Sequence, residues 1–320
     1  VLITADDSIS VTAQIGNTAA VNVDLDAVSG SISTTELITA TGNLTADAGT
    51  DIALDALTVT GTVDVGQAIQ PTGMIDFNDA VDAGGAITAD AGGDIIVDGT
   101  MDSDAAVDLD AGNMLDVNNT IGGTVITLNA NGDVDTTGAI TADGTNVTIT
   151  GDADVVIGAV VDAPNTINIT AGDDLTVNAA IASNDGDDVT LTVDTGSVLP
   201  TATVEADNEV TINAGNDMTL GGSVTADAAD VNLMTQTGTI DANAQITAQV
   251  NVIANAGSDA EFNAPVGATA GMIDIDAEGT VLTDGTATLT AGGGNVDIDA
   301  NDSVVLGNNV NASADVLITA

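Results

Sequence analysis

One phrase of about 21 residues is repeated from one end of the sequence to the other. It reads apolar, polar, apolar, polar, Ala, then a corner of Gly, Asn or Asp, a second short apolar segment, another corner and a last apolar anchor. Its copies cover Val210–Val224, Ile167–Ile181, Val107–Ile121 and Val296–Val310, with looser copies at Ile87–Met101 and Val147–Val161. Such a period is typical of solenoids, whose repeats are stable only when they stack on one another.

The copies form one uninterrupted series. Their first apolar residues lie at positions 1, 21, 44, 65, 87, 107, 126, 147, 167, 189, 210, 231, 250, 273, 296 and 316. Pro71 and a denser apolar pattern blur the register between Leu57 and Val81. No change of composition and no linker divides the series, so we predict one continuous array over residues 1–320.

Within each copy the polarity alternates with a period of two, which indicates a half-buried β-strand. In Val210–Ala214, the apolar residues face one side and Thr211 and Asn213 face the other. The fifth, inward position shrinks to Ala in most copies, for example Ala171 and Ala300. Gly, Asn and Asp follow because they tolerate tight backbone turns and hydrogen-bond locally.

About three short strands and three corners in 21 residues correspond to one turn of a parallel β-helix. The sequence lacks the hexapeptide unit that is usual in left-handed coils, and helical spacing is nowhere sustained. We therefore predict an all-β, right-handed parallel β-helix (solenoid) of about 15 turns of about 21 residues, without α-helix. Phe77 and Phe262 are the only aromatic residues, so its core must consist mainly of Val, Ile, Leu and Ala.

The charge balance excludes several partners. The chain has 49 acidic residues and no Lys, Arg or His, which gives a formal net charge of −49. About 15 turns at ~4.8 Å spacing would form a rod of roughly 72 Å. Spreading the 49 charges over it gives one per ~1.5 Å, close to the one per ~1.7 Å of duplex DNA. We expect a diffuse layer of cations and no binding to nucleic acid or anionic membranes.

The repeats resemble those of filamentous-haemagglutinin-like, β-strand-repeat surface proteins of bacteria. The segments that carry the resemblance are Gly85–Gly99 and Gly221–Leu233, and the repeat pattern extends over nearly all of the chain. The resemblance implies a secreted protein of the cell surface, a long right-handed β-helix, and a role in adhesion or in a matrix. The chain departs from that family in having no basic residue. We also expect it to lack the N-terminal secretion domain that such proteins carry.

We predict no enzymatic activity and no catalytic residue. Polysaccharide lyases on β-helices need Arg or Lys to stabilise an enolate, and the chain has neither. Asp-only glycan hydrolysis is the formal alternative, with candidate clusters at Asp6–Asp7, Asp173–Asp174 and Asp185–Asp188. Asp is, however, the usual corner residue of these repeats. We also expect no turn to carry a long insertion that could form the wall of a substrate cleft. Thr-x-Thr segments are typical of ice-binding β-helices, but Asn and Asp interrupt the Thr columns here, so we do not expect ice binding.

An acidic ridge is predicted along one edge of the stacked turns. Ca²⁺ prefers several carboxylate oxygens, so we interpret this ridge as a candidate site for Ca²⁺ or other, mostly diffuse, cations. No organic cofactor is expected. The residues of the ridge are Asp162, Asp185, Asp187, Asp188, Glu205, Asp207, Glu209, Asp227 and Asp230.

The sequence Val-Leu-Ile-Thr-Ala occurs at both Val1–Ala5 and Val316–Ala320. We interpret this repetition as a sign that the chain is an internal stretch of a longer repetitive protein. The predicted function is an extracellular structural fibre, surface coat or matrix: a stiff, acidic, protease-resistant filament that binds itself end to end or laterally and is bridged by cations. The alternatives are the stalk of an adhesin and, less favoured, an Asp-based glycan hydrolase.

Overall fold

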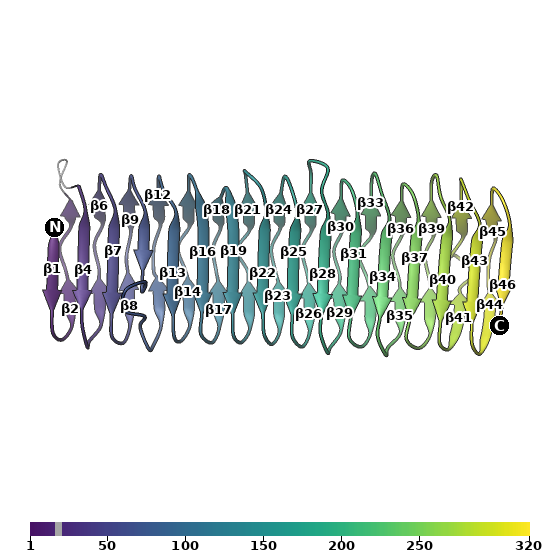
Figure 1. Ribbon diagram of the computed structural model, residues 1–320, viewed down its shortest axis with the longest axis horizontal. Coiled ribbons are helices and arrows are strands. Elements are labelled where there is room, and N and C mark those ends of the chain that lie inside the picture. Colours follow the sequence, from purple (N-terminus) through teal and green to yellow (C-terminus); the bar gives the residue numbers. More distant parts are fainter. Residues whose placement is uncertain (17–20) are drawn as a thin grey trace. The chain divides into compact units, whose positions relative to one another are not determined.

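The computed structural model describes residues 1–16 and 21–320, and these residues form strands and turns without any helix. None of them belongs to a helix with the length and apolar character needed to cross a bilayer. The chain divides into two compact units, Val1–Ala153 and Asp154–Ala320. In each unit, successive strands of the chain join three parallel sheets in rotation (Figure 1). The prediction of an all-β solenoid is confirmed.

The first unit contains β1 to β22. Its first sheet has the order β1 (Leu2–Ala5), β4 (Val23–Ala27), β7 (Leu44–Ala48), β10 (Val63–Val65), β13 (Ile87–Ala91), β16 (Ala106–Ala111), β19 (Val125–Ala130), β22 (Val147–Gly151). The second has the order β2 (Ile9–Val11), β5 (Ile32–Thr34), β8 (Ile52–Leu54), β11 (Ile75–Phe77), β14 (Ile95–Val97), β17 (Leu115–Val117), β20 (Val134–Thr136). The third has the order β3 (Ile15–Gly16), β6 (Ile38–Ala40), β9 (Leu57–Val59), β12 (Val81–Ala83), β15 (Met101–Ser103), β18 (Ile121–Gly123), β21 (Ile140–Ala142).

The second unit repeats the arrangement. Its first sheet has the order β25 (Ile167–Ala171), β28 (Val189–Val193), β31 (Val210–Ala214), β34 (Val231–Thr235), β37 (Val252–Ala256), β40 (Ile273–Ala277), β43 (Val296–Ala300), β46 (Val316–Thr319). The second has the order β23 (Val155–Ile157), β26 (Leu175–Val177), β29 (Val198–Pro200), β32 (Met218–Leu220), β35 (Ile240–Ala242), β38 (Ala260–Phe262), β41 (Thr280–Thr283), β44 (Ser303–Leu306). The third has the order β24 (Val161–Ala163), β27 (Ile181–Ser183), β30 (Val204–Ala206), β33 (Val224–Ala226), β36 (Ile246–Ala248), β39 (Val266–Ala268), β42 (Leu289–Ala291), β45 (Val310–Ala312).

The coil is right-handed within each unit, as predicted. In Figure 1 the strands of the first sheet lie nearer the viewer and run downward while the chain advances from left to right. The strands of the other two sheets lie behind them and run upward. This rotation with this direction of advance defines a right-handed solenoid.

The core consists of the inward residues of the strands, stacked in columns. In β31, the side chains of Val210 and Ile212 are fully buried and that of Ala214 is 1% exposed. The outward neighbours Thr211 and Asn213 are half-buried. Parallel partners of the same type lie directly above and below, as in the pair Ile212↔Leu233. Burial of apolar area at about 25 cal/mol per Å² and the continuous backbone ladders stabilise each turn only in contact with its neighbours.

Corner Asp and Asn side chains have a structural role between turns. The residue just before a strand directs its backbone N–H toward the preceding turn. The side-chain oxygen of the Asp or Asn at the same position of that turn accepts this hydrogen bond. Asp230 Oδ1 accepts the N–H of Asn251 at 2.8 Å, and Asn251 Oδ1 accepts that of Met272 at 2.9 Å. Asp217 and Asp259 do the same for the next turns of the second sheet. Because an unpaired buried N–H is costly, these bonds explain why Asp and Asn recur at this place.

The predicted starts of three repeats are wrong by two residues. The chain pairs in the first sheet from Val23, Val63 and Val252, whereas the sequence pattern placed the starts at positions 21, 65 and 250. A shift by two leaves the alternation intact, so periodicity could not detect it. Val21, the residue predicted to begin the second repeat, is 68% exposed.

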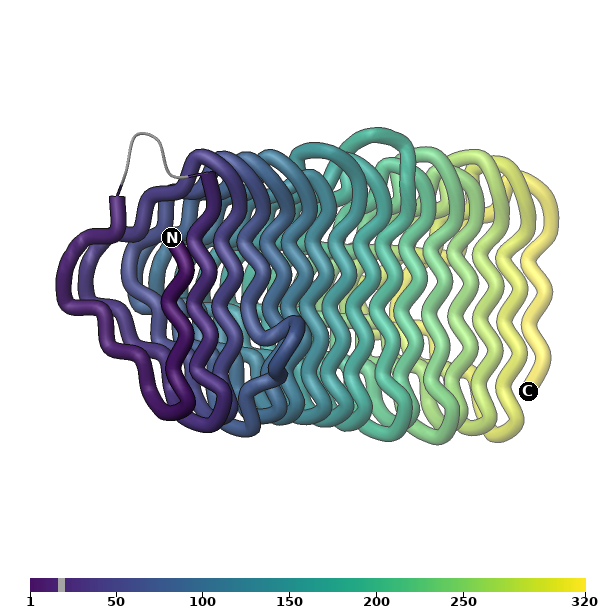
Figure 2. The backbone as a smooth tube through the Cα atoms, turned by 60° about the vertical axis from the view of Figure 1, so that its left-hand side comes forward, coloured from purple at the N-terminus to yellow at the C-terminus, as the bar shows by residue number. Residues whose placement is uncertain are grey.

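A detour between β10 and β11 contradicts the expectation that no turn carries a long insertion. Strand β10 has three residues where its neighbours β7 and β13 have five. The chain leaves the sheet at Gly66, whose φ of 72° belongs to the left-handed region that favours glycine. Figure 2 shows the backbone leaving the regular path here. The N–H groups of Ala68 and Ile69 donate to Asp47 Oδ1 at 2.9 and 3.2 Å, and Gln70 donates to Asp90.

Candidate functional site

The predicted acidic ridge lies in the second unit and is divided into separate columns. Asp188, Glu209 and Asp230 precede β28, β31 and β34, and their carbonyls accept the backbone N–H groups of Ile167, Val189 and Val210. Asp207 and Asp227 follow β30 and β33. Asp162 and Glu205 point outward from β24 and β30, but Ala182 lies between them in the register. Asp185 and Asp187 belong to the loop between β27 and β28.

Several of these carboxylates already accept hydrogen bonds from the protein. Asp188 Oδ1 accepts the amide of Asn208 at 2.7 Å and the N–H of Glu209 at 3.1 Å. Asp207 Oδ2 accepts the N–H of Gly186 at 3.1 Å, and Asp162 accepts the amide of Asn184. Among residues 1–16 and 21–320, no three carboxylates converge closely enough to hold a metal ion. Cation binding along the ridge stays a prediction.

The candidate catalytic clusters are corner residues. Asp173 Oδ1 accepts the hydroxyl of Thr195 at 3.0 Å, and Asp174 Oδ1 accepts the N–H of Ser197 at 2.8 Å. Asp6 and Asp7 are exposed in the turn after β1. Each of these pairs is spread along the chain at a bend rather than gathered across neighbouring strands.

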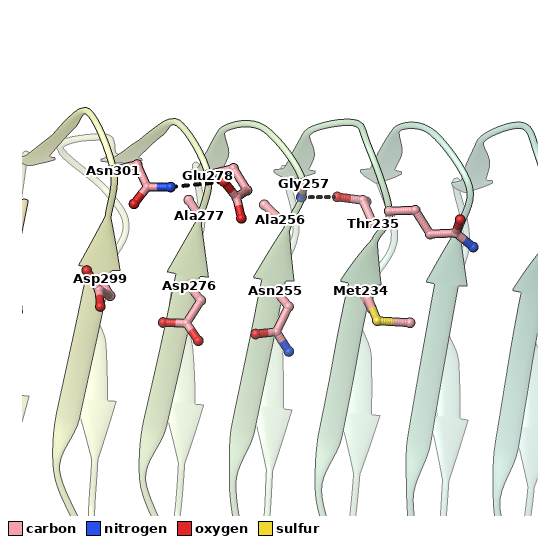
Figure 3. A pocket seen from close by; sticks show the side chains of 11 residues that line it. Met234, Thr235, Asn255, Ala256, Gly257, Asp276, Ala277, Glu278, Asp299 and Asn301 are labelled. Atoms are coloured by element: carbon pink, nitrogen blue, oxygen red, sulfur yellow. Dashed lines mark hydrogen bonds between the residues drawn. The ribbon is translucent and has the colours of Figure 1, made fainter.

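A polar groove of about 640 Å³ lies on the outer face of the first sheet in the second unit (Figure 3). One wall is the row of fourth residues of β34, β37, β40 and β43, which are Met234, Asn255, Asp276 and Asp299. The other wall is a row of corner residues that includes Gln236, Glu278 and Asn301. The small residues Ala256 and Ala277 lie between the two rows.

The two walls of this groove differ in their hydrogen bonding. Asn301 Nδ2 donates to Glu278 Oε2 at 2.9 Å, so the corner wall is internally bonded (Figure 3). On the strand wall, Asn255, Asp276 and Asp299 make no side-chain hydrogen bond within the described part of the chain. Their donors and acceptors therefore face solvent, one residue for each turn.

Four carboxylates of this face form a compact acidic grid: Asp274 and Asp276 on β40 with Asp297 and Asp299 on β43. Asp274 pairs with Asp297 and Asp276 with Asp299 in the register. Burial raises the pKa of Asp274, and Asp276 and Asp297 raise it further. Burial also raises the pKa of Asp276, with Asp299 and Asp297 as the next causes. The chain offers no basic side chain to compensate them.

The first unit contains a smaller groove of about 320 Å³ on the corresponding face. Gln70 of the detour lines it together with Asp90, Asp110 and Asn131. Beside it, burial raises the pKa of Asp108, followed by the effects of Asp110 and Asp90. The detour thus provides one wall of this groove. The repeat pattern did not predict this wall, although Gly66 and Pro71 marked an irregular repeat in the sequence.

Chemically, both grooves offer carboxylate and carboxamide groups and no basic or thiol group. Carboxylates only accept hydrogen bonds, whereas carboxamides both donate and accept. Such surfaces can hold hydrated cations or polar, uncharged chains. The sequence indicated acidic columns, but it did not indicate which strands bring four of them together.

The chain matches no protein-family model, no curated protein and no solved structure.

Proposed function

We propose that this chain is a structural, non-enzymatic segment of an extracellular filament, surface coat or matrix. The observation that carries the proposal is the uninterrupted repetition within each unit. Within each unit, parallel ladders join successive turns, and columns of Val, Ile and Leu fill the interior. Stability that comes from neighbouring turns suits a molecule whose task is to be long and stiff.

The absence of Lys and Arg supports a protease-resistant, extracellular role, because it removes the cleavage sites of trypsin-like proteases. The net charge of −49 would keep such filaments soluble and apart at low ionic strength. Electron microscopy of the native material, released without denaturant, tests the proposal. We expect long unbranched filaments with an axial repeat of about 4.8 Å. Short, separate particles would contradict the proposal.

Cation bridging is a further part of this proposal. The carboxylates of the acidic ridge and of the acidic grid would hold Ca²⁺ or similar hard cations between filaments. Removing divalent cations with a chelator at constant ionic strength should disperse filament bundles. Bundles that persist under this treatment would show that divalent cations do not bridge them.

The stalk of an adhesin, with a distal domain that binds, stays the alternative from the sequence. The polar groove of Figure 3 favours a variant of it in which this segment itself binds a ligand. Binding of the purified protein to immobilised neutral glycans, compared with an Asn255→Ala variant, tests this alternative. Binding that the variant loses would support a ligand-binding role of the groove. Equal retention by both proteins would leave the structural role as the better account.

A further inference from the structure

The chemistry of self-association in this chain follows from its composition. Hydroxyl and carboxamide groups are each donor and acceptor, whereas an ionised carboxylate is an acceptor only. With no Lys, Arg or His in the sequence, a carboxylate on one copy finds no charged partner on another. Direct contact with a second copy, without bridging cations, is therefore most favourable on a surface where Thr, Ser, Asn or Gln take the place of carboxylates.

One outward surface of the second unit has this composition. Two outward columns of β25, β28 and β31 pair as Asn168↔Thr190↔Thr211 and Thr170↔Thr192↔Asn213. We call these six residues the neutral patch. All are half-buried, so their polar groups lie on an even strand surface rather than on mobile loops.

Most polar groups of the neutral patch are free to bond elsewhere. Thr211 Oγ1 donates to Glu209 Oε1 at 2.9 Å. The side chains of Asn168, Thr170, Thr190, Thr192 and Asn213 make no hydrogen bond within the part of the chain that the structure describes. They offer donors and acceptors in a regular array with the spacing of neighbouring strands, about 4.8 Å.

The other two sheets of this unit offer a narrower surface. Their strands opposite the patch, such as β26 and β27, have three residues and present one outward side chain per turn. Strands of the first sheet have five residues and present two. In the third sheet the outward residues of β24 and β30 are the carboxylates Asp162 and Glu205.

We propose that the neutral patch is a lateral contact surface for a second copy of this chain. The proposal rests on the proposed filament function and adds which face pairs when filaments lie side by side. The contact is isologous, because a patch of hydroxyls and carboxamides is complementary to itself. Interdigitated side chains between facing sheets are a known source of cohesion, and ladders of Asn side chains along the strands add to it.

Charge at the rim makes this contact dependent on salt. Asp188 and Glu209 border the patch on one side, and Asp194 borders it on the other. Facing sheets pack about 10 Å apart, so the rims of two copies repel when the Debye length is about 30 Å at 0.01 M salt. At 1 M salt the Debye length is about 3 Å, and the repulsion is screened.

The test is analytical ultracentrifugation of the whole chain at about 0.01 M and 1 M monovalent salt, without divalent cations. We expect monomers at low salt and pairs at high salt. The variant Thr190→Asp with Thr192→Asp should weaken pairing at high salt by about tenfold or more, because buried like charges face each other. The control, Thr225→Asp with Thr247→Asp, adds the same charge on outward positions of β33 and β36 and should leave pairing within about twofold.

A second variant tests the patch without adding charge, and its fold is measured separately. Thr190→Val with Thr192→Val preserves shape and neutrality, and its circular dichroism at low salt reports the fold. It should also weaken pairing at high salt, since the hydroxyls are lost. A wild-type chain that stays monomeric at high salt would overturn the inference, and so would equal weakening in both Asp variants. Single filaments that never pair laterally would overturn it while leaving the filament function intact.

Discussion

The neutral patch and the acidic grid lie on the same sheet of the same unit, and their interiors are alike. Under the patch, Ile169 and Ile212 are fully buried; under the grid, Ile275 and Ile298 are fully buried. The outward residues differ completely: Thr and Asn in one region, four Asp in the other. The comparison teaches that the inward columns stabilise each turn, while the residue types at the outward positions can vary without changing the fold.

The two regions also differ in electrostatics. Burial and mutual repulsion raise the pKa of Asp274 and Asp276 in the grid. An exposed corner carboxylate behaves in the opposite way: hydrogen bonds from the Thr286 hydroxyl, the Thr286 N–H and the Ala287 N–H lower the pKa of Asp284. A corner carboxylate that accepts hydrogen bonds therefore stabilises the fold in its ionised form. The ionised carboxylates of the grid instead destabilise the turns that carry them.

The largest expected effect comes from the interior and should be the same in both regions. Ile212→Ala under the patch and Ile275→Ala under the grid each remove a fully buried side chain. We expect each to cost about 2–5 kcal/mol of local stability. Hydrogen exchange of the neighbouring amides is the appropriate measurement, since repeat arrays need not unfold in one step. A cost below about 1 kcal/mol at only one site would show that the interiors are not equivalent.

A smaller effect is expected at a corner near the patch. Asp230→Ala removes the acceptor of the Asn251 N–H and Nδ2, at 2.8 and 3.0 Å. Leaving these donors unpaired should cost about 1–3 kcal/mol. Asp230→Asn keeps the Oδ1 acceptor and is the matched control, with little loss expected. If both variants were equally destabilised, the charge rather than the hydrogen bond would be responsible.

The grid should make its turns more stable at acidic pH. The folded state holds the protons of Asp274 and Asp276 more tightly than the unfolded chain does, because their pKa values are raised. Their contribution is most favourable below the ordinary carboxyl pKa of about 3.9 and is lost as pH rises through the raised values. Asp274→Asn with Asp276→Asn should remove this dependence and protect β40 and β43 at neutral pH.

Hydrogen exchange measured at several pH values, and corrected for the intrinsic exchange rate, checks this prediction. The amides within β28 and β31 are the internal control, since these two strands carry no carboxylate. A grid whose stability does not change between about pH 4 and 7 would contradict the inferred effect of burial and repulsion. Equal changes in both regions would point to the overall charge instead.

The smallest effect on stability is expected from Thr190→Val in the patch. The hydroxyl has no partner within the described residues, and the side chain is half-buried. The change in unfolding free energy should stay within about 0.5 kcal/mol. Thermal unfolding at low salt measures it. A larger loss would show that the hydroxyl supports the turn itself, and the patch would then be part of the scaffold.

The sequence by itself determined the repeat, the class of fold and the direction of most side chains. Alternation in Val210–Ala214 and its copies indicates which residues are inward, and the structure buries them. Gly, Asn and Asp at the corners indicate where the chain bends. These properties depend on residues close together in the chain, so the local sequence pattern was sufficient to predict them.

The tertiary structure alone decided which residues become neighbours between turns. Residues about 21 positions apart meet according to the number of residues in each intervening corner, and a shift by two preserves the alternation. For this reason the pattern misplaced the second repeat at Val21, and it missed the detour that begins at Gly66. The predicted acidic ridge was divided into columns for the same reason, while Asp274, Asp276, Asp297 and Asp299 were gathered on two paired strands.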